Sequence, residues 1–164
     1  MSRILIVAYG NPMRCDDGVA WRASEELEKK FSNLKVEILR THQLTPELAA
    51  TVSLCEAVIF VDAASANAVG NGLPGEIRVG PVGLAPIQPG FSHHVSPGVV
   101  MALASELFRA TPHAVAVTLT GESFDHGEEL SAVVKAALPD LVQRIATLAQ
   151  EFLDQPAPML PANS

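Results

Sequence analysis

The chain has 164 residues, 48% of them hydrophobic and 18% charged, and its formal net charge is −7. This size and composition are typical of one globular domain with a substantial core, and they exclude a disordered or fibrous chain. The acidic balance excludes a general nucleic-acid binder, which needs a basic surface. No segment approaches the roughly 20 apolar residues that cross a bilayer and no leader-like segment opens the chain, so we expect a cytoplasmic protein without a membrane partner.

The first half of the chain alternates predicted strands and helices. Residues 3–9 predict a buried strand, because they include six consecutive apolar or aromatic residues that leave no polar face. Over residues 17–32, apolar side chains recur every four positions, which predicts a helix. Similar patterns predict three more elements: a strand at 35–40, a helix capped by the Thr45 hydroxyl and running to about Leu54, and a strand at 57–63.

The segment 65–75 is rich in Gly and Pro and predicts a loop in place of a crossover helix. Without a crossover, the next strand, at 76–79, is expected to run antiparallel to its predecessor. The proline-rich segment 80–92 is expected to be a loop with room to act as a mobile flap beside the site.

The last third of the chain predicts a helix, a strand and a long helix. Ser96-Pro97 is a helix start, in which a capping hydroxyl precedes a proline at the first turn. A strand is predicted at 114–119, and helical periodicity extends from Leu130 to Phe152. Pro139 is expected to kink this helix or to begin a new one. We expect a single domain at 1–153 and a disordered tail at 154–164.

Three candidate site residues stand where strands end or helices begin. Asp17 lies in the segment GNPMRCDDG at positions 10–18, directly after the first predicted strand. Asp62 closes the apolar run of the third strand, and His93 precedes the helix that begins near Ser96. In open α/β sheets, ligands bind beyond the carboxyl ends of the strands. Two carboxylates and an imidazole at that edge suit a borderline divalent ion such as nickel or zinc.

Each of these residues also has a structural interpretation. Asp16 or Asp17 can cap the following helix, because carboxylates at helix N-termini accept hydrogen bonds from free amides. Asp62 can be a hydrogen-bonded turn residue. His93 or His94 can order the loop, and the two stay alternatives for the same ligand position. The dinucleotide, Walker and serine-hydrolase motifs are absent from the sequence.

Taken in order, the segments resemble the maturation endopeptidases of nickel-iron hydrogenases. That family's pattern has an apolar strand, Gly-Asn, a short spacer and an acidic pair, then a Val-Asp-Ala strand end and a Ser/Thr-His before a helix. The matching segments here are GNPMRCDDG at 10–18, VDA at 61–63 and SH at 92–93, and the resemblance extends over about residues 3–150.

The resemblance implies a three-layer α/β/α sandwich of the phosphorylase/hydrolase-like kind, with a mixed five-stranded sheet whose fourth strand is antiparallel. It implies an endopeptidase that removes the C-terminal extension of the hydrogenase large-subunit precursor after nickel insertion. Asp17, Asp62 and His93 would contact nickel that the substrate supplies, and zinc or cadmium would substitute for it. Asp16 or another carboxylate would be the general base if the metal serves only for recognition.

Two alternatives to this function stay open. The same acidic site suits a nickel-binding accessory protein that docks on the large subunit without cutting it. It also suits an α/β peptidase with an unrelated substrate. Ala20-Trp21 departs from the Gly-Val that is common in the family at these positions, and the bulky Trp21 next to the first ligand turn bears on which substrate is recognised.

Overall fold

The structure is a computed structural model, and it describes residues 3–32, 35–67, 72–88 and 95–155. Five strands form one sheet in the order β2-β1-β3-β5-β4. The strands are β1 (Ile4–Tyr9), β2 (Val36–Thr41), β3 (Ala57–Ser65), β4 (Ile77–Pro81) and β5 (His113–Gly121). β4 pairs antiparallel with β5, and all other pairs are parallel. The predicted mixed sheet with an antiparallel fourth strand is therefore confirmed.

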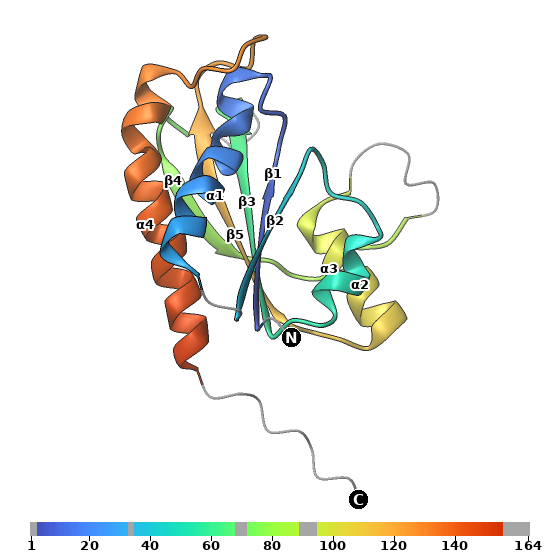
Figure 1. Cartoon of the computed structure of the whole chain (residues 1–164). Helices are drawn as coiled ribbons and strands as arrows, with labels where there is room; N and C mark the ends of the chain where they lie inside the picture. Colours follow the sequence, from blue (N-terminus) through green and yellow to red (C-terminus); the bar gives the residue numbers. More distant parts are fainter. Residues whose placement is uncertain (1–2, 33–34, 68–71, 89–94, 156–164) are drawn as a thin grey trace, which may run out of the picture.

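Helices cover both faces of this sheet (Figure 1). They are η1 (Cys15–Gly18, a 3-10 turn), α1 (Val19–Lys30), α2 (Leu48–Val52), α3 (Pro97–Phe108) and α4 (Ala132–Asp154). α1 and α4 pack together on one face, and α2 and α3 on the other. Each face has its own apolar core, and alternate residues of β1 and β3 contribute to the two cores because successive strand side chains point to opposite faces. The predicted three-layer sandwich is confirmed.

Two predicted helix starts differ in detail from the structure. The helix predicted from Asp17 begins as the 3-10 turn η1, and regular α-helix follows only from Val19. α2 has five residues and begins at Leu48, without the side-chain cap expected from Thr45. Thr45 instead opens a turn through its carbonyl, which accepts a hydrogen bond from the Leu48 amide at 3.1 Å. The predicted cap at α3 is confirmed, because the Ser96 hydroxyl accepts a hydrogen bond from the Val99 amide.

Pro139 neither ends α4 nor begins a new helix. It lies inside one helix of 23 residues, so of the two expectations, a kink or a new helix, the new helix is wrong. Only the hydrogen bond that its missing amide would have made to Lys135 is lost, and the ring is exposed to solvent. The apolar stripe of α4 is buried against the sheet on both sides of Pro139, at Val134 and Leu141 for example, and this packing holds the helix together.

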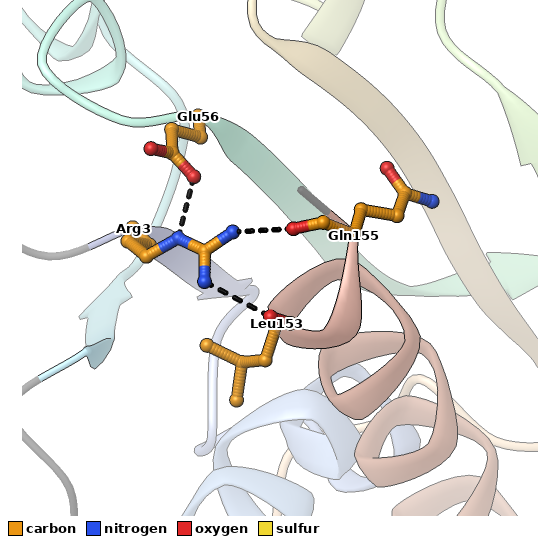
Figure 2. A network of polar contacts seen from close by, with 4 residues as sticks. All are labelled: Arg3, Glu56, Leu153 and Gln155. Atoms are coloured by element: carbon orange, nitrogen blue, oxygen red, sulfur yellow. Dashed lines mark hydrogen bonds and ion pairs between the residues drawn. The ribbon is translucent and has the colours of Figure 1, made fainter. Parts of the chain in front are cut away.

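Arg3 joins the two ends of the described chain (Figure 2). Its guanidinium forms a 2.6 Å ion pair with Glu56 and donates hydrogen bonds of 2.9 Å to the carbonyls of Leu153 and Gln155. These carbonyls end α4 and have no partner within the helix, so a cation there satisfies them. Because Arg3 precedes β1, the C-terminal end of α4 is fixed at the amino edge of the sheet.

Two expectations from the sequence fall wholly or partly outside the described residues. The expected flap at 80–92 is described only to residue 88, where residues 82–88 form neither helix nor strand. In the expected tail at 154–164, Asp154 is the last residue of α4 and residues 156–164 are not described.

Candidate functional site

Asp17 and Asp62 meet at the carboxyl edge of the sheet. Asp17 lies in η1, which follows β1 and packs against β3. Asp62 lies near the carboxyl end of β3, opposite Thr118 of β5. The strand continues to Ser65, two residues beyond its predicted end at residue 63. The two carboxylates lie near each other, and the charge of Asp17 adds to the effect of burial on the pKa of Asp62.

A tight turn after β1 places Asp17. Gly10 has a φ of +137°, and a Cβ at this position would lie 2.1 Å from the Asp17 carbonyl oxygen. Only glycine fits so close to the backbone in this conformation. The turn is held from the other side by the Asn11 amide, which donates a 2.8 Å hydrogen bond to Oδ2 of Asp17. Gly10 and Asn11, the Gly-Asn of the motif, thus orient the first candidate ligand.

Asp62 is an unusually weak acid for an aspartate. Burial, and then the negative charge of Asp17, raise the pKa of its carboxyl to about 7. The Ala63 amide and the Tyr9 hydroxyl hydrogen-bond to the carboxylate and lower the pKa, but they do not outweigh the other two effects. When both carboxylates are ionised, Asp17 and Asp62 repel each other, and water screens this repulsion only in part because both are half-buried. A divalent cation between them removes the repulsion.

Tyr9 belongs to the site, although sequence reasoning assigned it to the buried strand. Its hydroxyl hydrogen-bonds to Asp62, and burial, followed by the Asp62 charge and this bond, raises the pKa of the hydroxyl. Tyr9 therefore stays a protonated donor at neutral pH. The only signal in the sequence was a single polar group at the end of an otherwise apolar run, one residue before Gly-Asn.

Asp16 is fully buried, and both of its carboxylate oxygens are occupied. It accepts hydrogen bonds from the amides of Glu122, Ser123 and Ser131 and from the Ser131 hydroxyl, all at 2.8 to 2.9 Å. Burial opposes ionisation, but these hydrogen bonds outweigh it and lower the pKa of Asp16. A carboxylate so engaged is a poor proton acceptor. The geometry favours a structural role for Asp16 over the expected general base.

The third predicted ligand lies outside the described residues, as do both candidates for it, His93 and His94. Within the described ranges, no group of three His, Cys, Asp or Glu side chains is placed to hold a metal ion. α3, which begins at Pro97, runs back toward the amino end of the parallel strand β5. The start of α3 therefore lies at the same edge as Asp17 and Asp62.

Among the described helices, none combines the length and apolar character that a bilayer crossing requires. The described part of the chain includes two cysteines, Cys15 and Cys55, and no disulfide joins them.

Comparison with known proteins identifies the fold through structure and not through sequence. No family model and no curated protein sequence matches the chain. Among solved structures, the hydrogenase maturating endopeptidase HybD from E. coli matches with a TM-score of 0.70 and 21% identity, over 91% of this chain and 93% of that chain.

Two archaeal proteins match similarly. The NiFe hydrogenase maturation protease HycI from Thermococcus kodakarensis KOD1 has a TM-score of 0.70 and 23% identity, over 94% of each chain. The NiFe hydrogenase maturation protease HybD from Thermococcus kodakarensis has a TM-score of 0.64 and 24% identity, over 90% of this chain and 99% of that chain. The chain thus has the fold of the hydrogenase maturation endopeptidases, the family that its sequence motifs resemble.

Proposed function

We propose that this protein is an endopeptidase that removes the C-terminal extension of a nickel-iron hydrogenase large-subunit precursor after nickel insertion. In this proposal Asp17, Asp62 and His93 contact nickel that is already bound in the substrate, and the protein works in the cytoplasm. Nickel is part of the substrate and not a resident cofactor, and zinc or cadmium ions can take its place in binding experiments.

The observation that carries the proposal is the pairing of Asp17 with Asp62. The two carboxylates come from separate elements, and burial, followed by the negative charge of Asp17, raises the pKa of Asp62 to about 7. Such an arrangement costs free energy in the absence of a cation and is relieved by one. Oxygen and imidazole donors together suit nickel and zinc, and the fold matches that of proteins named hydrogenase maturation proteases.

The same pair explains why processing would wait for nickel. A precursor without nickel offers the two carboxylates nothing to bind, and their mutual repulsion persists. A precursor with nickel neutralises them, so it is bound with the scissile segment beside the metal. Nickel held by these residues would also supply Lewis-acid chemistry toward a neighbouring carbonyl group or water if it does more than mark the substrate. Asp16, which the sequence suggested as a base, serves in this proposal to hold η1 in place.

The test is processing of a purified, nickel-loaded precursor, followed by mass spectrometry of its C-terminus. We expect the wild-type protein to release one C-terminal peptide. Asp17→Asn and Asp62→Asn should each abolish release, because each removes a charged ligand while keeping the size of the side chain. His93→Ala should reduce release more than His94→Ala.

Asp125→Asn is the matched control. Asp125 is an exposed carboxylate in the connection after β5, at the same edge of the sheet, and its loss should leave processing unchanged. Unchanged processing by both site variants would refute the metal contact. Binding of the nickel-loaded precursor without release of a peptide would instead support the docking-protein alternative.

A further inference from the structure

Tyr9 and Asp62 are neighbours on adjacent strands. β1 and β3 pair in parallel with Ala8 opposite Val61, which brings the next residue of each strand side by side. Both side chains lie on the sheet face that α2 and α3 cover. Tyr9 packs against the core of that face, and Phe60, two residues before Asp62, belongs to the same core. The phenol ring is thus fixed by packing, at the point where the site begins.

The hydroxyl of Tyr9 is explained by its hydrogen bond and not by packing. A phenylalanine ring would fill the same apolar space, and a half-buried hydroxyl needs a partner to offset its lost hydration. That partner is the Asp62 carboxylate, which the Ala63 amide also contacts. Two donors from rigid elements, one side chain and one backbone group, restrict how the carboxylate can turn.

We propose that Tyr9 is a positioning residue, whose hydroxyl holds the Asp62 carboxylate in the orientation in which it contacts the nickel of the substrate. The inference rests on the proposed function and adds to it a residue that no motif marks. Hydrogen-bond partners of metal ligands typically change metal affinity by about 10-fold to 100-fold when they are removed. The expected contribution of Tyr9 lies in that range.

The first experiment compares metal binding by the wild type and Tyr9→Phe, using calorimetric titration with Ni²⁺ and Cd²⁺ salts. We expect the dissociation constant of Tyr9→Phe to rise roughly 10-fold or more, with an unchanged far-ultraviolet circular dichroism spectrum. In an Asp62→Asn background, Tyr9→Phe should have no further effect on affinity, because the group through which it acts is gone. A purely structural role would lower affinity in both backgrounds.

Thr118→Val is the matched control for removing a hydroxyl. Thr118 lies opposite Asp62 on β5, the other strand beside β3. Its substitution should leave the dissociation constant for both ions within twofold of the wild type. An effect as large as that of Tyr9→Phe would show that any change beside Asp62 disturbs binding, and would overturn a specific role for Tyr9.

A second measurement uses the fact that the chain contains one tyrosine. Incorporation of fluorotyrosine labels position 9 alone, so its fluorine resonance reports on this phenol. We expect saturating Cd²⁺ to shift the resonance in the wild type but not in Asp62→Asn.

The outcomes separate the two proposals. If the wild type binds neither ion, the proposed nickel contact fails, and the role of Tyr9 fails with it. If the wild type binds them, but Tyr9→Phe has equal affinity and the fluorine resonance does not move, only the role of Tyr9 is overturned.

Discussion

Asp16 and Asp17 are adjacent in sequence but differ in their surroundings. Asp16 is buried, with four hydrogen bonds from the β5–α4 connection. Asp17 is half-buried, and Oδ2 accepts a hydrogen bond from Asn11 while its charge acts on Asp62. The 3-10 turn causes the difference, since it directs consecutive side chains to different sides. Asp16 thus holds the turn in place, whereas Asp17 is one of the two carboxylates of the candidate site.

The raised pKa of Asp62 predicts how stability depends on pH. The folded protein holds the Asp62 proton up to about pH 7, whereas the ordinary pKa is 3.8. The unfavourable charge is therefore absent at low pH, and stability falls as the pH rises from 3.8 to about 7, above which the loss is complete. We expect Asp62→Asn to melt at a higher temperature than the wild type at pH 8, and the difference to shrink toward pH 5.

Thermal melting in the absence of metal, at several pH values, measures this effect. Asp125→Asn, which removes an exposed carboxylate, should show no such trend. A difference between Asp62→Asn and the wild type that stays constant from pH 5 to pH 8 would contradict the assigned pKa.

At the scale of elements, the connection between β5 and α4 is attached to the turn that bears Asp17. Asp16 accepts hydrogen bonds from both ends of this connection, at Glu122 and Ser123 on one side and at Ser131 on the other. Gly121 permits the contact, since a Cβ there would lie 3.0 Å from the Asp16 Cβ. A single carboxylate thus joins the start of α1 to the start of α4.

Asp16→Ala should destabilise the fold strongly. It leaves several buried donors without an acceptor, and each such group costs about 1–3 kcal/mol, so we expect a loss of roughly 3 kcal/mol or more. Urea unfolding followed by circular dichroism measures this loss, with Asp125→Ala as the exposed control. If Asp16→Ala were as stable as the wild type but inactive, Asp16 would regain the general-base role.

Most helices and strands could be predicted from the sequence because each is specified by a few residues that are close together in the chain. The apolar run of β1, the Ser96-Pro97 cap and the Gly/Pro-rich segment before β4 each depend on a few neighbouring residues. The role of Asp16 depends instead on partners more than 100 positions away, and no local pattern reveals them. The new helix considered at Pro139 is absent for a similar reason, since tertiary packing of α4 outweighs one missing hydrogen bond.

At the scale of the whole molecule, Arg3 holds the beginning of the sheet and the end of the last helix together. Its partners Leu153 and Gln155 are 150 or more positions away in sequence. Its ion pair with Glu56 adds the segment that leads into β3 (Figure 2). The contact closes the chain at the edge of the sheet opposite the acidic pair.

Arg3→Ala should loosen the last turn of α4 and leave the site intact. We expect a loss of about 1–2 kcal/mol in the free energy of unfolding, because hydrogen bonds from a charged, partly buried donor are lost. Hydrogen exchange of the amides near Leu153 should become faster, and metal affinity should not change. Lys29→Ala, which removes an exposed ion pair with Glu26, should have almost no effect; an equal effect of the two variants would contradict the role of Arg3.

The closure at Arg3 also determines where the molecule can be tethered. β1 alone has six residues, so the two edges of the sheet are separated by about 20 Å. An affinity tag or a solid support attached after Gln155 would start from the edge away from Asp17 and Asp62. An immobilised form of the protein would therefore present its acidic pair to a large folded partner, whereas a tether inserted in the connection between β5 and α4 would obstruct it.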